Sequence, residues 1–255
     1  NGGSFPFSTN DDYLKTSFKK VYKQGNFKAT TDPSEFSKAD VIVVDINLDI
    51  DFLESNPKLG LQTLINAIKT IGKYITPETL LLIETTVPPG TCEKVIAPIL
   101  FEELKKRQLE KDSIYLAHSY ERVMPGPDNV DFIQNFYRVY SGVNQKSAND
   151  AERFLKTIIY TDKFPLTRLG NTNATEMAKV LENSYRAMNI AFAVEWSRFA
   201  EESGVNLYEV INAIRMRPTH NNLMFPGIGV GGYCLTKDPL LASWSRKNIF
   251  NGSVG

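Results

Sequence analysis

Hydrophobic and polar positions along the first two thirds of the chain follow two alternating periods. Short apolar runs of strand length are separated by longer stretches in which apolar residues recur every three or four positions, as on one face of a helix. The strand-like runs cover residues 39–46, 79–86, 113–119 and 136–142, and the helical stretches cover residues 11–25, 59–75, 89–107 and 146–159. Strands that alternate with helices predict an α/β fold with a doubly wound sheet.

The pattern changes at Asn171, where one helical pattern begins that continues to Gly204. Asn173 is the expected N-cap, Glu176 three residues later is expected to complete a capping box, and Gly204 is the expected stop. About 30 residues at 1.5 Å per residue make a rod of roughly 45 Å, longer than a typical globular helix. Such a rod commonly links domains or builds the core of a dimer, so we expect a homodimer through residues 173–203.

Two further helices complete this second part of the chain. A short helix is predicted over residues 206–217, and Asp238 is expected to cap a last helix with Pro239 in its first turn. The chain is therefore predicted to divide into an α/β domain over residues 1–168 and an all-α domain over residues 169–255.

Composition narrows the class of partner. The 255 residues include 29 basic and 29 acidic side chains without a long run of like charge, so a nucleic-acid partner is not expected. No apolar run reaches the roughly 18 residues that a membrane helix needs, and two cysteines are too few for a disulfide scaffold or a cysteine zinc site. We expect a cytoplasmic protein with no membrane or metal site.

The stretch "GIGVGGYCLTKDP", residues 227–239, surrounds one cysteine with glycines. Glycine weakens helices and strands, but it allows a ligand to approach the backbone closely. The helix expected after Cys234 and the charge of Lys237 would both favour a thiolate, as a nucleophile needs. The alternative is a small buried cysteine in a glycine-rich turn, where it serves packing alone.

Other candidates for chemistry lie on the long helix. Glu176, Lys179 and Asn183 are spaced i, i+3 and i+7, so they share one stripe. A lysine there can stabilise an oxyanion, and a neighbouring asparagine can hold a water molecule. The alternative is an ordinary exposed Glu–Lys pair.

Polar residues also follow two of the predicted strands. Thr85 and Thr86 end one strand, and Glu121 and Arg122 follow another. Ligands of open α/β sheets bind outside the carboxyl ends of the strands, although a capping threonine or a local ion pair would explain these residues equally well. His118 and His220 have no metal-ligand spacing, and capping or core hydrogen bonds are expected of them.

Four stretches together resemble the UDP-glucose/GDP-mannose dehydrogenase family of nucleotide-sugar dehydrogenases. They are "ETTVPPGT", "SYERVMPG", "EMAKVLENSYRAMNIAFAVEWSRFAEESGVN" and "GIGVGGYCLTKDP", which match in order and spacing within a similarity that runs from about residue 30 to about residue 245. The resemblance implies an incomplete Rossmann-like domain followed by a helical dimerisation domain. It also implies a nucleotide-sugar substrate, whose C6 primary alcohol is oxidised to a carboxylate with NAD used twice.

The resemblance also assigns roles to residues. Cys234 is implied to be the nucleophile that forms a thiohemiacetal and then a thioester. Lys179 matches the lysine that stabilises the oxyanion, Asn183 its partner, and Thr86 the hydroxyl that holds a water. Asp238 and Glu121 match two further acidic residues of the site. The cofactor is expected to contact Thr85, Thr86, Glu121 and Lys237, and the sugar Arg122, Lys179, Asn183, Gly229, Gly231 and Gly232.

Three departures from the family pattern stand out. The "ER-x-x-PG" form, with Pro125 where the glucose-oxidising branch has a second glutamate, is more like the branch that acts on N-acetylated UDP-sugars. The opening strand, its G-x-G-x-x-G loop and the acidic residue for the ribose are absent, so we interpret the chain as a fragment of a longer enzyme. The stretch "VDINLDID" replaces the apolar-Pro-Thr stretch that the family more often has near the cofactor.

Two rival functions predict different observations. A cysteine-dependent hydrolase or acyltransferase needs His220 or His118 within hydrogen-bond reach of the Cys234 sulfur. A non-catalytic dimerisation module would form dimers but would show no thermal shift with NAD or a UDP-sugar.

Overall fold

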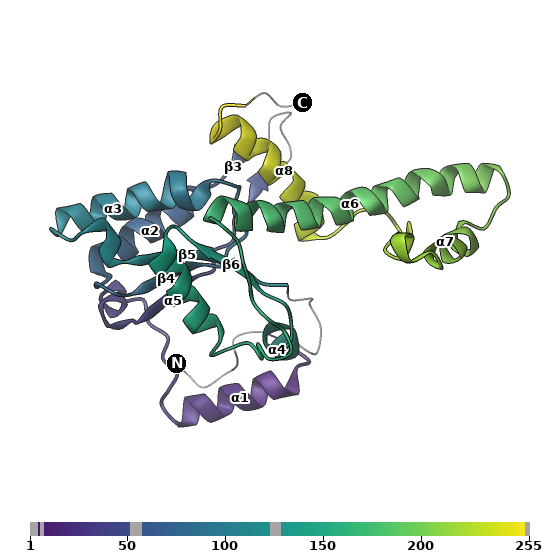
Figure 1. Cartoon of the computed structure of the whole chain (residues 1–255). Helices are drawn as coiled ribbons and strands as arrows, with labels where there is room; N and C mark the ends of the chain where they lie inside the picture. The colour runs from purple at the N-terminus through teal and green to yellow at the C-terminus, as the bar shows by residue number, and fades with distance from the viewer. Residues whose placement is uncertain (1–4, 6–7, 52–57, 123–128, 253–255) are drawn as a thin grey trace. The chain divides into compact units, whose positions relative to one another are not determined.

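In the computed structural model, the apolar runs predicted as strands lie side by side in one five-stranded sheet with the strand order β1-β4-β5-β6-β7 (Figure 1). The structure describes residues 5, 8–51, 58–122 and 129–252. The sheet strands are β1 (Val41–Val44), β4 (Leu80–Ile83), β5 (Tyr115–Tyr120), β6 (Val139–Gly142) and β7 (Thr167–Arg168). Strands β4 and β6 are buried along their whole length, as expected of runs without polar alternation.

The direction of the strands changes once. Strands β1, β4 and β5 are parallel, β6 is antiparallel to β5, and β7 is parallel to β6. Helix α2 (Gln62–Tyr74) connects β1 with β4, and α3 (Ala97–Lys106), preceded by the π-helix η2 (Cys92–Ile96), connects β4 with β5. The only described helix between β5 and β6 is α4 (Asn129–Gln134), and six residues are too few for the crossover that a parallel strand needs.

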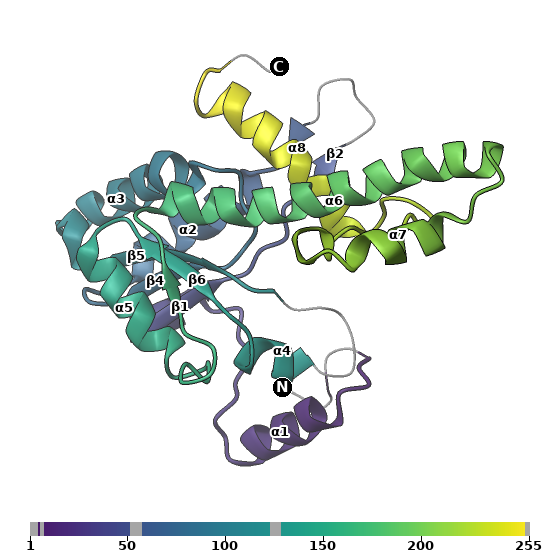
Figure 2. The same ribbon diagram turned by 45° about the vertical axis from the view of Figure 1, so that its right-hand side comes forward.

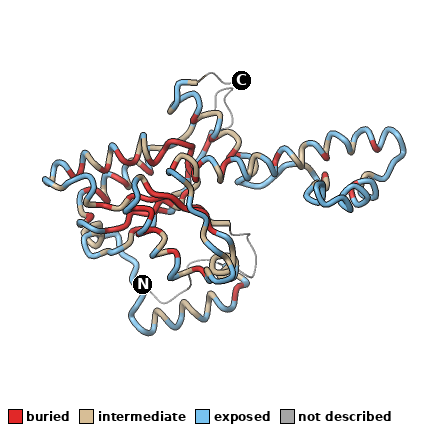
Figure 3. Tube along the Cα trace, viewed as in Figure 1, coloured by how far each residue is buried: buried red, intermediate tan, exposed pale blue. Residues whose placement is uncertain are grey.

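Helices cover both faces of the sheet, as the doubly wound prediction requires (Figures 1 and 2). Helices α2 and α3 lie together on one face, and α5 (Gln145–Leu155) lies on the other. A buried cluster between α5 and the sheet combines Leu80, Leu82, Ala117, Tyr140, Ala148, Ala151, Leu155 and Ile159. The buried positions are therefore concentrated on the strands and on one side of each covering helix (Figure 3).

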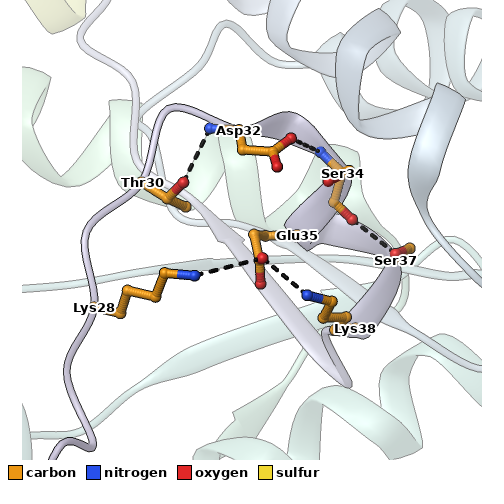
Figure 4. Close-up of polar contacts among 7 residues, drawn as sticks. All are labelled: Lys28, Thr30, Asp32, Ser34, Glu35, Ser37 and Lys38. Carbon is orange, nitrogen blue, oxygen red and sulfur yellow. Dashed lines mark hydrogen bonds and ion pairs between the residues drawn. The ribbon is translucent and has the colours of Figure 1, made fainter.

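The sheet edge at β1 differs from the sheet centre. Among the described strands, β1 pairs only with β4, and its Val43 side chain is 43% exposed. A cleft of about 560 Å³ runs beside this edge, between β1, α2 and the 3-10 helix η1 (Pro33–Lys38). In η1, Glu35 pairs with Lys28 and Lys38 at 3.5 and 2.9 Å, while Asp32 accepts the Ser34 N–H (Figure 4).

The chain forms two compact units whose boundary falls inside the long helix α6 (Thr172–Glu202). The first unit contains the sheet, its covering helices, helix α1 (Asp12–Lys23), the 3-10 helix η3 (Lys111–Ser113) and the first turn of α6. The second unit contains residues 49–59, 86–89 and 177–255. The first turn of α6 belongs to the sheet unit because Thr175 bonds to His118 of β5 and Ser141 of β6.

The second unit is mainly helical, as the sequence predicts. It contains the rest of α6, α7 (Leu207–Arg215), the 3-10 helix η4 (Pro218–His220), α8 (Tyr233–Asn248), and the short antiparallel pair β2 (Ile50–Asp51) and β3 (Lys58–Leu59). Its small core joins Ile50 of the pair with Val180 of α6 and Leu241 of α8. None of the helices in the described part of the chain has the length and apolar character to cross a lipid bilayer.

Two predicted helix starts are wrong. Helix α6 begins at Thr172, and its cap is Asn171, whose side-chain oxygen accepts the Ala174 N–H at 2.9 Å. Asn173 instead donates to Glu93 at 3.1 Å, and Glu176 makes no capping box. Both asparagines suit a cap by residue type, so the choice depends on tertiary contacts that the local sequence does not contain.

The start of α8 is the second correction. The helix begins at Tyr233, five residues before Asp238, and Pro239 lies inside it. Gly232 precedes the first turn with φ 82° and ψ 162°, a conformation that is essentially restricted to glycine. The Asp-Pro signal is a good N-terminal pattern, but here the backbone turn at Gly232 starts the helix earlier.

Candidate active site

Cys234 lies at the second position of α8, inside the helix rather than before it. Its side chain is exposed, and it is not part of a disulfide. The N-terminal N–H groups of a helix favour negative charge at this position. The sulfur therefore has the exposure and the local dipole that a nucleophile needs, and the packing alternative for Cys234 is not supported.

The glycines before Cys234 have different structural reasons. Gly229 and Gly232 have φ values of 98° and 82°, which L-residues adopt only with strain. Gly231 has no such conformation, and a Cβ atom built on it would meet no atom within 4 Å. The fold therefore requires glycine at positions 229 and 232 but leaves the space beside Gly231 open.

Tyr233 and Lys237 form a second layer around the start of α8. The Tyr233 hydroxyl donates to Asp49 at 2.9 Å, and the Lys237 ammonium lies 4.6 Å from the centre of the Tyr233 ring. Lys237 is only 4% exposed and lies 3.9 Å from a carboxylate oxygen of Asp238. Lys237 thus packs within the first turns of the helix that carries Cys234. A contact between Lys237 and the cofactor, as predicted, would have to be made by a buried side chain.

Asn183 and Asp238 connect the long helix with the cysteine helix. The Asn183 side chain donates to the Asp238 carboxylate at 2.5 Å, and Asp238 is 1% exposed. Asp238 follows Cys234 by one helical turn, so both lie on the same side of α8. Lys179 lies one turn before Asn183 on α6 and is 8% exposed. The structure therefore brings Asn183 and Asp238 together next to the turn of Cys234.

The loop with Thr86 belongs to the same unit as α8. Residues 86–89 pack in the second unit, and the Ser245 hydroxyl of α8 donates to the Pro89 carbonyl at 2.5 Å. Thr86 itself is half-buried. The sheet unit contains its neighbour Thr85, whose hydroxyl accepts the Ile46 N–H at 2.7 Å and donates to the Val44 carbonyl at 3.3 Å. Thr85 therefore has a structural task that the sequence did not indicate.

Glu121 and Arg122 lie in the sheet unit, at the end of β5, and both are half-buried. The Arg122 guanidinium donates to the Tyr137 carbonyl at 3.1 Å and to the Tyr120 hydroxyl at 3.2 Å, and lies 5.4 Å from the Tyr120 ring centre. Glu84 ends the neighbouring strand and pairs with Arg138 at 3.0 Å. Burial raises the pKa of Glu84, Arg138 opposes this, and Asp45 and Glu121 add to it. Pro125 and Gly126 of the predicted motif lie outside the described residues.

Comparison with known proteins identifies the family. Residues 2–160 match the NAD binding domain of the UDP-glucose/GDP-mannose dehydrogenase family, and residues 173–250 match its central domain. The chain belongs to this family. The sheet unit thus corresponds mainly to the NAD binding domain, which supports NAD as the cofactor, and the loop with Cys234 lies in the central domain.

Several similar proteins are named UDP-N-acetyl-D-mannosamine dehydrogenases. A UDP-N-acetyl-D-mannosamine dehydrogenase from Methanocaldococcus jannaschii is 36% identical over 95% of this chain and 52% of its own length. One from Campylobacter jejuni is 33% identical over 89% of this chain and 54% of its own length. A solved structure of UDP-D-ManNAc dehydrogenase from Pyrococcus horikoshii superposes with a TM-score of 0.83 at 32% identity, covering 97% of this chain and 55% of that chain. The chain spans about half the length of these relatives.

The residues present fit NAD only in part. The carboxyl ends of β1, β4 and β5 lie next to one another at the carboxyl-terminal end of the sheet, where dinucleotides bind in such folds. Glu121 directly follows one of these strands. The chain does not contain the opening strand and glycine-rich loop of the family. Residues 227–232 have G-x-G-x-x-G spacing, but the described structure has no strand leading into them, as a dinucleotide loop requires.

The histidines do not support the hydrolase alternative. His220 is exposed and bonds to the Thr219 hydroxyl at 2.8 Å, and the structure describes no hydrogen bond between it and Cys234. His118 is completely buried in the sheet unit, where burial lowers its pKa to about 3. A histidine that stays neutral inside the core cannot collect a proton from an exposed thiol.

The position of Glu176 differs most from the one that the sequence predicts. It is fully buried in the sheet unit, and its two carboxylate oxygens accept the N–H groups of Gly90 and Cys92 at 2.6 and 2.7 Å. It is therefore not an exposed partner of Lys179. No local signal reveals this contact, because Gly90 and Cys92 lie more than 80 residues away along the chain.

Proposed function

We propose that the complete protein is an NAD-dependent nucleotide-sugar 6-dehydrogenase that oxidises the C6 primary alcohol of a UDP-N-acetylhexosamine to a carboxylate. The observation that carries the proposal is the exposed Cys234 at the start of α8, one turn from the contact between Asn183 and the buried Asp238. The names of the relatives favour UDP-N-acetyl-D-mannosamine as the substrate. The two free cysteines also fit a reducing compartment, and we place the reaction in the cytoplasm.

In the proposed reaction the C6 carbon is oxidised twice, and only the second oxidation requires a nucleophile. Bound NAD would accept one hydride in each oxidation, and Glu121 at the carboxyl-terminal end of the sheet would contact it. After the first oxidation the C6 carbon is an aldehyde, and Cys234 Sγ adds to it to form a thiohemiacetal with the proton transferred to the former carbonyl oxygen. Loss of the second hydride and of that proton gives a thioester. Water then adds to the thioester carbon, the carboxylic acid is released, and the thiol regains its proton.

The remaining site residues act on charge and water. In this proposal the Lys179 ammonium stabilises the oxygen as negative charge develops during sulfur addition and again during hydrolysis. Asn183 and Thr86 hold the water that attacks the thioester, and Asp238 orients Asn183 through their 2.5 Å hydrogen bond. The open space beside Gly231 admits the sugar to the sulfur. Arg122 orients the strand end that carries Glu121.

A homodimer is the second part of the proposal. Large apolar side chains occur along one face of α6 at spacings of four, four and three residues, and each is at least half exposed: Met177, Leu181, Tyr185, Met188, Phe192, Trp196 and Phe199. An 11-residue repeat is close to three turns of an α-helix, so the stripe drifts by only about 20° per repeat. Exposed apolar surface of this extent marks an interaction site. A second copy of the same helix offers the matching stripe.

The experiment is an assay of the complete protein for NADH across UDP- and GDP-sugars, with Cys234→Ala beside wild type. We expect two NADH per sugar from wild type with UDP-N-acetyl-D-mannosamine, and from the variant no acid product and at most the aldehyde. Cys92→Ala is the matched control, because Cys92 is buried in the other unit, and it should keep two NADH per sugar. Acid formed by Cys234→Ala at a normal rate would refute the role of the sulfur.

A further inference from the structure

Buried polar contacts fix the first turn of α6 in the sheet unit. The Thr175 hydroxyl donates to the Thr172 carbonyl at 3.0 Å and bonds to His118 Nδ1 and to the Ser141 hydroxyl at 2.8 and 2.7 Å. Since a hydroxyl has one proton, Thr175 accepts from both His118 and Ser141. One side chain thus ties the helix to two strands of the sheet, β5 and β6.

Glu176 adds the strongest of these contacts. Its carboxylate accepts the two N–H groups at the start of the helical segment that leads into α3, and these groups have no partners within that segment. Hydrogen bonds to an ionised acceptor are about twice as strong as neutral ones. A neutral amide has only one acceptor oxygen, so glutamine could not satisfy both N–H groups.

The carboxylate is costly to bury. Burial raises the pKa of Glu176 to about 7, against the bonds from Cys92 and Gly90, and the charge of Glu93 on the facing helix raises it further. An apolar residue would avoid this penalty but would leave the Gly90 and Cys92 N–H groups without a partner. A cost of this kind is typical of a group that serves a function rather than packing.

Glu176 and its partner Gly90 are both close in sequence to residues of the proposed site. Gly90 follows the loop of residues 86–89, which includes Thr86, and Glu176 precedes Lys179 and Asn183 on one continuous helix. Residues 176, 179 and 183 follow one another along one face of this helix.

We propose that Glu176 is a positioning residue of the dehydrogenase site, which fixes the end of the loop with Thr86 and the rotation of the helix face that carries Lys179. This inference rests on the proposed function. Glu176 touches neither substrate nor cofactor in it, and acts only through the placement of the residues that do. Small displacements of such residues are expensive, since about 1 Å can cost roughly 100-fold in rate.

The test compares Glu176→Gln with wild type in the complete protein. We expect kcat to fall roughly 10- to 100-fold with KM changed less than about threefold, because positioning is lost while binding groups remain. Glu202→Gln, an exposed glutamate in the last turn of the same helix, is the matched control and should keep wild-type values. Wild-type kcat in Glu176→Gln at all pH values would overturn the proposal.

The pH profile separates positioning from a general loss of structure. The groups that face Glu176 are Cys92 and Glu93 of the neighbouring helix, and Lys179 follows on its own helix. Wild-type kcat should decline on acidification through pH 7, as the carboxylate takes up a proton, whereas Glu176→Gln should lack this decline. Cys92→Ala removes one hydrogen bond to the carboxylate and should move the decline to higher pH. If Glu176→Gln does not fold, this shift decides the matter, and an unchanged profile in Cys92→Ala would contradict the proposal.

Amide hydrogen exchange provides a readout without catalysis. The Gly90 and Cys92 N–H groups should exchange faster in Glu176→Gln than in wild type, and the Glu202→Gln control should leave them unchanged. If wild type made no NADH, the proposed function would fail even where exchange confirms the contact. If wild type were active and the variant equal to it, only the role of Glu176 would fail.

Discussion

Gly231 is a glycine that the backbone conformation does not require, unlike its neighbours. Its neighbours Gly229 and Gly232 have backbone conformations that exclude other residues, whereas Gly231 has an ordinary conformation and open space beside it. A Cβ atom there would meet no described atom of this chain within 4 Å. A sugar bound beside it would be affected by such an atom.

Gly231→Ala should therefore reduce activity without reducing stability. Alanine at a compatible position stabilises a protein by about 0.4–1 kcal/mol through the unfolded chain, so the midpoint of thermal unfolding should stay or rise. The value of kcat/KM for the nucleotide sugar should fall at least tenfold. Gly170→Ala, also exposed and without a neighbour within 4 Å, is the control and should keep full activity. Normal kcat/KM in Gly231→Ala would show that the sugar does not approach there.

Two buried groups of the sheet unit make stability depend on pH in opposite directions. The pKa of Glu176 is raised to about 7 from 4.5, so its contribution is complete below pH 4.5 and is lost as the pH rises through 7. The pKa of His118 is lowered to about 3 from 6.5, so its contribution is present above pH 6.5 and is lost as the pH falls towards 3. Between pH 4.5 and 6.5 the two effects oppose each other.

Glu176→Gln should remove one of these effects and expose the other. The free energy of unfolding, measured with urea, should then decrease more steeply between pH 7 and pH 5 in the variant than in wild type. The relevant measurement is the difference between the two slopes, since other groups contribute equally to both proteins. Equal slopes would mean that the Glu176 carboxyl does not titrate in this range.

At the scale of elements, the sequence was sufficient where periodicity alone decides. Strands such as Leu80–Ile83 are continuous apolar runs, and the stop of α6 at Gly204, with φ 70°, follows from one residue type. It was insufficient where a distant partner decides. Asn171 rather than Asn173 caps α6, Gly232 rather than Asp238 precedes the first turn of α8, and Glu176 bonds to Gly90 instead of pairing on its own helix.

The candidate site divides in the same way. Cys234 was found from its glycine-rich neighbourhood, and the Asn183–Asp238 contact agrees with residues that the motifs had singled out. The bond between Tyr233 and Asp49 joins residues 184 positions apart, and no pattern in either segment indicates it. Contacts of this kind follow from the fold and not from local sequence.

The apolar stripe on α6 leads to a prediction about this element. Met188→Glu with Phe192→Glu places charges in the middle of the stripe, where both side chains are more than half exposed in the single chain. Because these residues are already in water in the single chain, its folding should be little affected, whereas a paired stripe would have to bury the charges. Sedimentation velocity should show a dimer for wild type and a monomer for the double variant. A control pair on the opposite side of the helix, the exposed Arg186→Gln with Glu201→Gln, should remain dimeric. A wild-type monomer at micromolar concentration would refute the dimer.

At the scale of the whole molecule, the two domains matched by the family lie largely in different units of the chain. The sheet unit matches the NAD binding domain, and most of the proposed chemistry, including Cys234, lies in the second unit. Helix α6 is common to both, so its first turn is a place where a local change can reach the site. In this first turn, Thr175 and Glu176 form buried hydrogen bonds within the sheet unit, and buried positions become less frequent towards the far end of the helix (Figure 3).

The sheet edge at β1 has a consequence for handling the protein. Its four apolar residues offer backbone groups along one side that no described strand uses, and charged side chains or proline, which commonly protect such edges, are absent from β1 itself. An open, apolar edge of this kind is a template on which further strands can add. Preparations of this chain are therefore expected to aggregate as the protein concentration rises. The aggregation should proceed by edge-to-edge strand pairing at Val41–Val44, independently of any dimerisation through α6.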